Sequence, residues 1–91
     1  MSQADLSHHV YIIECCDGTL YTGYARNVEE RVKTHNEGKG AKYTRGRRPV
    51  RLLYSENCAS RSAALRREQE IKAKPRAAKL SLIRESGKQG L

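Results

Sequence analysis

The sequence predicts one α+β domain in which a three-stranded antiparallel sheet is flanked by helices, in the order β-β-α-β-α-α. Three observations favour this class. Two β-rich runs flank an Asp-Gly turn signal, a third alternating run follows later, and three stretches begin with helix-start signals. A chain of 91 residues has room for one hydrophobic core. We expect the folded domain to span residues 8–85, between flexible ends at 1–7 and 86–91.

The predicted sheet consists of three short strands. Residues 10–15 and 19–24 are β-rich runs, and the Asp17-Gly18 pair between them is a strong hairpin signal. Residues 50–55 alternate between two faces, which indicates the third strand. These runs predict a hairpin and one further strand, covered by helices.

The register of the hairpin decides whether its two tyrosines share a face, because successive residues of a strand point to opposite faces. A two-residue turn would place Tyr11 and Tyr21 on opposite faces. A three-residue turn, with Gly18 left-handed in a bulge, would place Tyr11 opposite Gly23 and both phenols on one face. We predict the three-residue turn, since only this register makes a joint site.

Three helices are predicted from capping residues and from apolar residues spaced three and four apart. A basic loop over residues 39–49, punctuated by glycines, separates the first helix from the third strand. The first helix runs from Asn27 to about Glu37. The second runs from Ser60 or Ser62 to about Lys74, and the third from Pro75 to about Glu85.

The charge distribution indicates a polyanionic partner. The net charge is +8 and the isoelectric point is about 9.8. Residues 1–37 hold three Lys and Arg against six Asp and Glu, a net of −3, whereas residues 38–91 hold fifteen against four, a net of +11. A domain with one strongly basic half is typical of nucleic-acid binding. An acidic membrane or an acidic protein is the alternative, but no basic amphipathic helix favours membrane contact.

The cysteines and the N-terminal residues predict a cytoplasmic protein. Cys15, Cys16 and Cys58 are an odd number without the spacing of a disulfide scaffold, which fits reduced thiols. Residues 1–9 lack the features of a secretory signal, and no apolar run approaches the roughly 20 residues of a membrane span. Because Cys15 and Cys16 point to opposite faces of a strand, we expect no metal–thiolate site.

Polar residues within two predicted helices are candidates for chemistry. Glu68 lies in the middle of an apolar stripe over residues 64–71, and a carboxylate that faces a core must be paired or bind a metal. Arg31 and His35 lie four residues apart on the first helix. Two structural alternatives remain: an ion pair between Glu68 and Arg31, and a His35 ring that packs on the core.

Four short segments, in this order, resemble the motifs of the GIY-YIG nuclease superfamily. Two are similar to its paired GIY and YIG motifs, one to its phosphate-binding helix, and one to the helix that carries its metal-binding glutamate. These segments are Val10-Tyr11-Ile12, Tyr21-Thr22-Gly23, 27–36 and 63–68. The resemblance covers about residues 8–85 and points to a short, stand-alone bacterial subgroup of uncharacterised proteins.

The resemblance implies a metal-dependent endonuclease that hydrolyses DNA with little sequence specificity, in DNA repair or recombination. Glu68 would be the one protein ligand of a largely hydrated Mg²⁺ or Mn²⁺ ion. Arg31 would bind a phosphate oxygen through its planar guanidinium group. Tyr11 or Tyr21 would orient or deprotonate the attacking water, and His35 would share this role.

Contacts with the nucleic acid are expected to reach the phosphate backbone, because no element has the signature of a base reader. The basic loop would neutralise phosphates, and its tyrosine would stack on an exposed base, with an ordinary surface loop as the alternative. The expected contact residues are Gly23, Lys42, Tyr43, Arg45, Arg47, Arg48, Arg67 and Lys72. We expect a monomer that binds DNA, with RNA or a targeting protein as further partners. A non-catalytic nucleic-acid-binding module of the same fold is the alternative function.

Overall fold

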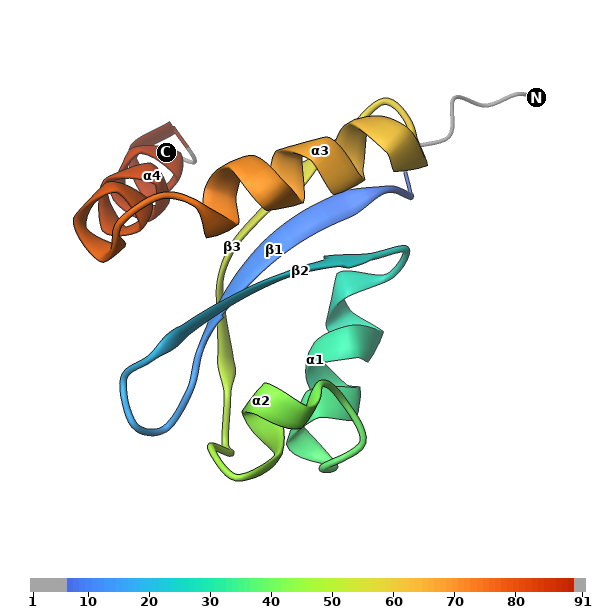
Figure 1. Cartoon of the computed structure of the whole chain (residues 1–91), viewed down its shortest axis with the longest axis vertical. Coiled ribbons are helices and arrows are strands. Elements are labelled where there is room, and N and C mark those ends of the chain that lie inside the picture. The colour runs from blue at the N-terminus through green and yellow to red at the C-terminus, as the bar shows by residue number, and fades with distance from the viewer. Residues whose placement is uncertain (1–6, 90–91) are drawn as a thin grey trace.

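Three antiparallel strands form the centre of the molecule in the computed structural model, which describes residues 7–89. Strand β1 (His9–Glu14) lies between β2 (Leu20–Ala25) and β3 (Arg51–Asn57), and both outer strands run antiparallel to it (Figure 1). The predicted α+β class with a three-stranded antiparallel sheet is confirmed. The predicted strand boundaries move by only one or two residues.

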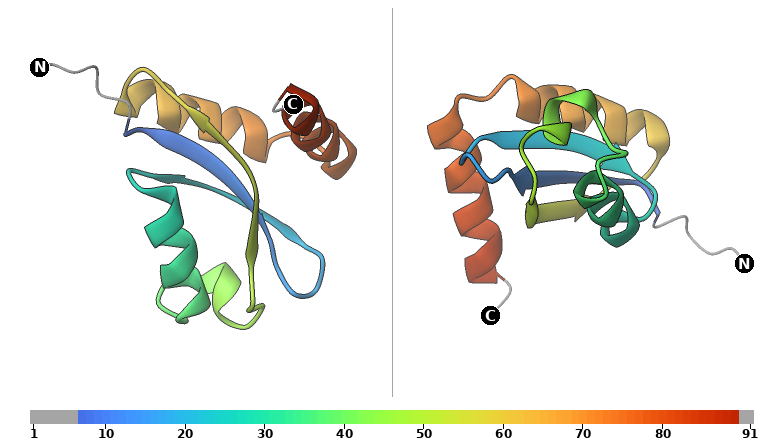
Figure 2. Two further views of the ribbon diagram at one scale, coloured as in Figure 1. Left: turned by 180° about the vertical axis from the view of Figure 1, so that it is seen from behind. Right: turned by 90° about the horizontal axis from the view of Figure 1, so that it is seen from below.

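Four helices cover the two faces of this sheet. Figure 1 shows α1 and α2 on one face and α3 and α4 on the other, and Figure 2 shows that α4 turns sharply away from the line of α3. In chain order they are α1 (Val28–Asn36), α2 (Lys42–Arg45), α3 (Arg61–Lys72) and α4 (Arg76–Gln89). No helix within residues 7–89 is long and apolar enough to cross a membrane.

The helices differ from the sequence prediction at three points. Helix α2 lies inside the predicted basic loop, because one helical turn is too short to show a hydrophobic period. Helix α3 ends at Lys72, before the predicted Lys74. Helix α4 passes its predicted end at Glu85, since the single Gly87 costs a helix only about 1 kcal/mol. Residues 1–6 and 90–91 of the predicted flexible ends lie outside the described residues.

Side-chain caps define where α1 and α3 begin. The Asn27 side chain accepts a hydrogen bond from the Glu30 N–H at 3.1 Å. Ser60 accepts one from the Ala63 N–H at 3.1 Å, so Ser60 and not Ser62 is the cap of α3. Each of these caps satisfies a backbone donor that has no partner inside the helix.

The hairpin adopts the predicted three-residue turn. Gly18 has φ of 85°, and the Cys15 N–H donates to the Thr19 carbonyl at 2.8 Å. Tyr11 pairs with Gly23, and Tyr21 lies two positions away on the same face of the sheet. The register prediction is therefore confirmed, and with it the shared face of the two tyrosines.

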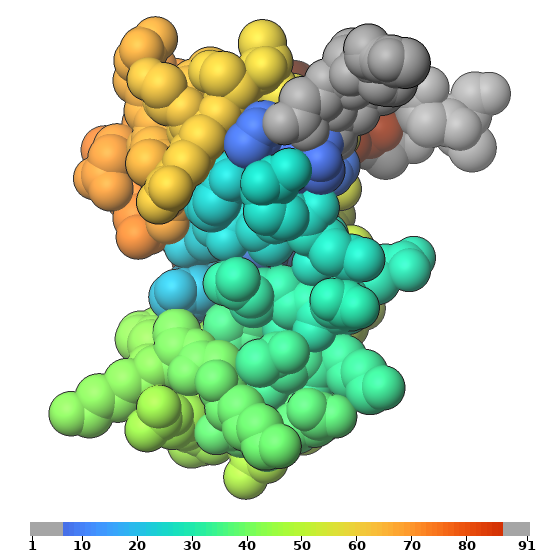
Figure 3. Space-filling view, turned by 90° about the vertical axis from the view of Figure 1, so that its right-hand side faces the viewer, coloured from blue at the N-terminus to red at the C-terminus, as the bar shows by residue number. Residues whose placement is uncertain are grey.

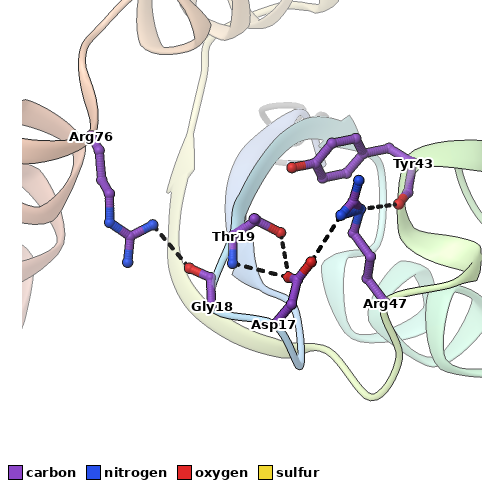
Figure 4. A network of polar contacts seen from close by, with 6 residues as sticks. All are labelled: Asp17, Gly18, Thr19, Tyr43, Arg47 and Arg76. Carbon is purple, nitrogen blue, oxygen red and sulfur yellow. Dashed lines mark hydrogen bonds and ion pairs between the residues drawn. The ribbon is translucent and has the colours of Figure 1, made fainter.

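The tip of the hairpin is held from two sides (Figure 4). The Asp17 carboxylate accepts hydrogen bonds from the backbone and hydroxyl of Thr19, at 3.1 and 2.7 Å, and forms an ion pair with Arg47 at 2.8 Å. On the other side, Arg76 at the start of α4 donates to the Gly18 carbonyl at 2.9 Å. These contacts connect the turn to both helical layers.

Two hydrophobic clusters lie on opposite faces of the sheet. The first packs Val10, Ile12 and Tyr54 against Ala64 and Ile71 of α3. The second lies under α1, where Val28 and Val32 pack on the other face. The residues of β1 in this second cluster are Tyr11 and Ile13. Both faces of the central strand are therefore buried, which explains its continuous apolar run.

Thr22 has a buried hydroxyl without a hydrogen-bond partner among the described residues, and its side chain is 3% exposed. An unsatisfied buried hydroxyl is destabilising, while valine has the same shape without this group. We expect Thr22→Val to raise the free energy of unfolding by about 1 kcal/mol in urea denaturation. As a control, Thr34→Val removes a hydroxyl that donates to the Glu30 carbonyl at 2.9 Å, and it should not stabilise the protein. A Thr22→Val variant less stable than wild type would contradict this expectation.

Candidate active site

Tyr11 lies at the centre of the site and depends on Gly23 for its position. A Cβ atom at Gly23 would lie 2.5 Å from the Tyr11 hydroxyl and 2.7 Å from the adjoining ring carbon, so the ring occupies the space above this glycine. Tyr11 is only 1% exposed, and Gly23 is buried beneath it. The prediction that Gly23 contacts nucleic acid is therefore wrong. Its lack of a side chain makes room for Tyr11 instead.

A buried chain of hydrogen bonds runs from Tyr11 to α2. The Tyr11 hydroxyl lies 2.9 Å from Nε2 of His35, and Nδ1 of His35 lies 2.9 Å from Oγ1 of Thr44. Thr44 in turn donates to the Ala41 carbonyl at 2.9 Å. His35 is 1% exposed and Thr44 is fully buried. The expectation that the His35 ring packs on the core is confirmed, and its contact with the Tyr11 phenol keeps a functional role as a prediction.

Burial and neighbouring charges keep this pair uncharged at neutral pH. Burial raises the pKa of Tyr11 to about 12, and Tyr21 and the Glu68 carboxylate add to this increase. The Arg31 guanidinium acts in the opposite direction, through its charge and a hydrogen bond. Burial, and then the positive charge of Arg31, lower the pKa of His35 below its ordinary value. The site therefore contains a neutral imidazole beside a protonated phenol.

The lowered pKa of His35 predicts how stability depends on pH. The unfolded chain binds a proton at His35 more readily than the folded protein does. The free energy of unfolding therefore decreases as the pH falls. The contribution of His35 is fully present above about pH 6.5 and decreases below it. Urea unfolding between pH 7 and pH 5 should show a smaller loss for His35→Gln than for wild type. Equal losses in the two proteins would contradict this prediction.

A cavity of about 600 Å³ opens beside these residues. Tyr21, Arg31 and His35 line it, together with two further cationic side chains, Arg26 and Lys39. Glu30 also lines the cavity, so three cationic side chains face one carboxylate. This excess of positive charge suits a phosphate group. Because Tyr11 binds His35 from behind the cavity wall, the cavity brings together four of the five predicted catalytic residues.

Aromatic contacts position Tyr21 in the cavity. Its ring meets His35 edge-on, with 5.6 Å between centroids, and stacks on Tyr43 at 5.8 Å. The guanidinium of Arg47 lies 4.3 Å from the centre of the Tyr43 ring. Tyr21 is half-buried, so it is the more accessible of the two predicted catalytic tyrosines.

Glu68 approaches the site from α3, which lies on the other face of the sheet. Its side chain is 13% exposed and forms an ion pair with Lys72 at 3.1 Å. Glu68 therefore pairs with Lys72, one helical turn away on the same helix, and the alternative of an ion pair with Arg31 is wrong. Glu68 is not among the residues that line the cavity, although its charge acts on Tyr11.

The residues around Glu68 fit a divalent ion that keeps most of its water ligands. Within the described part of the chain, no three His, Cys, Asp or Glu side chains are grouped so that they could share a metal. Magnesium dehydrates reluctantly and is often held by one or two carboxylates. Glu68 supplies one such carboxylate, which in this structure pairs with the Lys72 ammonium at 3.1 Å.

The predicted contact residues of the basic loop are exposed or partly exposed, and several of them also bind the protein itself. Lys42, Tyr43 and Arg45 are exposed, as contact with a nucleic acid requires. Arg47 pairs with Asp17, and Arg48 donates to the carbonyls of Arg45 and Asn36, at 3.0 and 3.3 Å. Arg47 and Arg48 therefore stabilise the fold in this structure, because they lie close to acceptors on the hairpin and at the end of α1. Figure 3 shows this segment in light green, below α1.

The two predicted contact residues on α3 are also engaged. Arg67 pairs with Glu56 at 2.9 Å and with Glu70 at 3.2 Å, and Lys72 pairs with Glu68. Glu56 lies on β3, so the Arg67 pair joins the helix to the sheet. Both side chains are also partly exposed, Arg67 at 30% and Lys72 at 43%, and their contact with nucleic acid stays a prediction.

Sequence reasoning missed Arg26, Lys39, Gly40 and Thr44 as parts of the site. Gly40 and Thr44 contact His35, and both belong to the segment that we interpreted as a basic loop. The glycine on either side of Lys39 was the available signal, since such spacing marks close approach of the backbone. Thr44 carried no signal of its own, because a lone threonine in a basic loop has no diagnostic spacing.

Comparisons with known proteins agree with this fold. The family model for the GIY-YIG catalytic domain matches residues 7–81. A UPF0213 protein of Staphylococcus aureus is 58% identical over 79 residues, which cover 87% of this chain and 96% of that protein. One from Staphylococcus haemolyticus is 59% identical over 78 residues, covering 86% and 95%.

Two solved structures are similar to this one. The solution NMR structure of a UPF0213 protein from Bacillus halodurans has a TM-score of 0.58 and 49% identity, and covers 88% of this chain and 85% of that chain. A solution NMR structure of a protein from E. faecalis has a TM-score of 0.56 and 39% identity, and covers 84% of this chain and 82% of that chain. With the GIY-YIG match and these relatives together, the chain belongs to the GIY-YIG family, in its UPF0213 group.

Proposed function

We propose that this protein is a divalent-metal-dependent endonuclease that hydrolyses DNA phosphodiester bonds with little sequence specificity. One observation carries the proposal: Tyr21, Arg31 and His35 line one positively charged cavity, and Tyr11 is hydrogen-bonded to His35 behind it. Membership of the GIY-YIG family points to a nuclease-type function. We place the activity in DNA repair or recombination, where enzymes with low sequence specificity act on altered DNA.

The residues of the cavity divide the work between binding and proton transfer. Arg31 binds a non-bridging phosphate oxygen, since its guanidinium is exposed and lines the cavity. Lys39 and Arg26 add positive charge for the neighbouring phosphates. Tyr21 orients the attacking water, because it is the accessible phenol.

Tyr11 and His35 together accept the proton of the attacking water. With a pKa of about 12, the Tyr11 phenol is a poor base unless its own proton has an acceptor. Nε2 of His35 lies 2.9 Å away and can take this proton as the Tyr11 hydroxyl receives another from water. Arg31 stabilises the negative charge that develops on the phenol oxygen. A Mg²⁺ or Mn²⁺ ion held by Glu68 would supply charge neutralisation at the phosphate and the leaving oxygen.

A plasmid-nicking assay tests the proposal. Supercoiled DNA is incubated with the protein in Mg²⁺, in Mn²⁺ and in EDTA, and the rate at which nicked circles form is measured. We expect nicking in either metal and none in EDTA. A protein that binds the plasmid but leaves it intact under all three conditions would overturn the proposal.

One observation favours the alternative of a non-catalytic nucleic-acid-binding module. Glu68 is paired with Lys72 and does not line the cavity, so the metal ligand is separate from the phosphate-binding wall. A binding module would show the same affinity for DNA, and the same dependence on salt, in wild type and in Glu68→Ala. If neither protein nicks DNA in the assay, this alternative replaces the enzyme.

A further inference from the structure

Both ring nitrogens of His35 are hydrogen-bonded, and their partners lie on different elements. Nε2 faces the Tyr11 hydroxyl on β1, and Nδ1 faces Oγ1 of Thr44 on α2, each at 2.9 Å. A neutral imidazole carries one proton, so one nitrogen donates and the other accepts. Which nitrogen is the acceptor decides whether Tyr11 can pass its proton to His35.

The hydroxyl of Thr44 determines this choice. It has one proton, which it donates to the Ala41 carbonyl at 2.9 Å. In this arrangement its oxygen accepts from the His35 ring. If Nδ1 lacked a proton, the Thr44 hydroxyl would have to give up its hydrogen bond to the Ala41 carbonyl in order to donate to the ring in this fully buried place, which is unfavourable.

We propose that Thr44 is a positioning residue that holds His35 in the Nδ1–H tautomer and so leaves Nε2 free to accept the Tyr11 proton. The consequence for catalysis rests on the proposed function, but the tautomer itself is a property of the folded protein. A fixed tautomer matters because the other one would donate from Nε2 to Tyr11 and block transfer.

The backbone around Thr44 is built closely against the same ring. A Cβ atom at Gly40 would overlap Nδ1 of His35, so only glycine fits there without a shift. The Thr44 N–H also donates to the Ala41 carbonyl, at 3.0 Å, so this one carbonyl orients both backbone and hydroxyl. The segment 40–44 thus encloses the Nδ1 side of the ring while the cavity lies beside it.

Heteronuclear NMR of the histidine ring nitrogens tests the tautomer directly, without any assay of activity. The measurement compares wild type, Thr44→Ser and Thr44→Val at neutral pH. We expect an unprotonated Nε2 in wild type and in Thr44→Ser, which keeps the hydroxyl. In Thr44→Val, the Nε2–H tautomer should become the major one, because its proton can still bind the Tyr11 oxygen. A protonated Nε2 in wild type, or an unchanged tautomer in folded Thr44→Val, would overturn the proposal.

Kinetics on the same three proteins test the consequence for catalysis. Thr44→Val should lower kcat for nicking by about tenfold or more, with little change in KM, and Thr44→Ser should restore most of the rate. Wild-type kcat in Thr44→Val, together with a changed tautomer, would remove Thr44 from the reaction. If wild type itself does not nick DNA, the proposed function fails while the NMR result still decides the tautomer.

Discussion

Replacing Tyr11 with phenylalanine should lower the rate of DNA cleavage by about 100-fold or more, while DNA binding is retained. The change removes only the hydroxyl that lies 2.9 Å from Nε2 of His35. Without this oxygen, the attacking water loses the path for its proton to the imidazole. The ring still fills the space above Gly23, so the sheet keeps its packing.

Tyr54 offers a matched control for this experiment. It is also a buried tyrosine, and burial raises its pKa to about 12 as well. Its hydroxyl donates to Glu56. Its ring belongs to the cluster under α3, on the face of the sheet opposite to Tyr11. Tyr54→Phe should therefore leave kcat unchanged, whereas Tyr11→Phe should lower it. Equal rates in Tyr11→Phe and wild type, with both folded by circular dichroism, would exclude Tyr11 from catalysis.

Glu68→Gln should reduce metal-supported cleavage by about 100-fold and abolish the response to added Mg²⁺. Glutamine keeps the shape of the side chain but removes the charge that a hydrated divalent ion needs. The variant also loses the ion pair with Lys72, one helical turn away. Such a pair contributes less than about 1 kcal/mol to the free energy of unfolding. The fold should therefore persist, and the effect should appear in the titration of rate against Mg²⁺.

Glu70→Gln is the matched control for Glu68→Gln. Glu70 lies on the same helix two residues later, is 57% exposed, and pairs with Arg67 at 3.2 Å. Its removal should leave both the rate and its dependence on Mg²⁺ as in wild type. A response to Mg²⁺ that survives in Glu68→Gln would show that the metal binds elsewhere and would withdraw Glu68 as the ligand.

Local patterns were sufficient to predict the framework of this site. The turn residues around Gly18 allowed two registers, and the one predicted for the sake of a joint site is the one observed, with Tyr11 and Tyr21 on one face. Asn27 and Ser60 cap the helices that carry Arg31 and Glu68. These features depend on residues close together in the chain, where steric and hydrogen-bonding preferences act directly.

The partners of the charged side chains could not be predicted in the same way. Arg47 pairs with Asp17, thirty residues away in the chain, a contact that its place in a basic loop did not suggest. Glu68 pairs with Lys72, although an apolar stripe suggested a partner on another helix. A charge pattern shows that an element is basic, but each side chain binds the nearest acceptor that the packing of other elements provides.

The sequence by itself determined the α+β class and the family of this protein, because these follow from local periodicity, turn residues and the order of short motifs, whereas it left two hairpin registers open. Only the tertiary structure decided that Tyr11 lies over Gly23 and binds His35, and that Thr44 orients the other side of that ring. Tyr11 and His35 are 24 residues apart, and no local preference specifies a contact across that separation. Packing of α1 and α2 against one face of the sheet creates it.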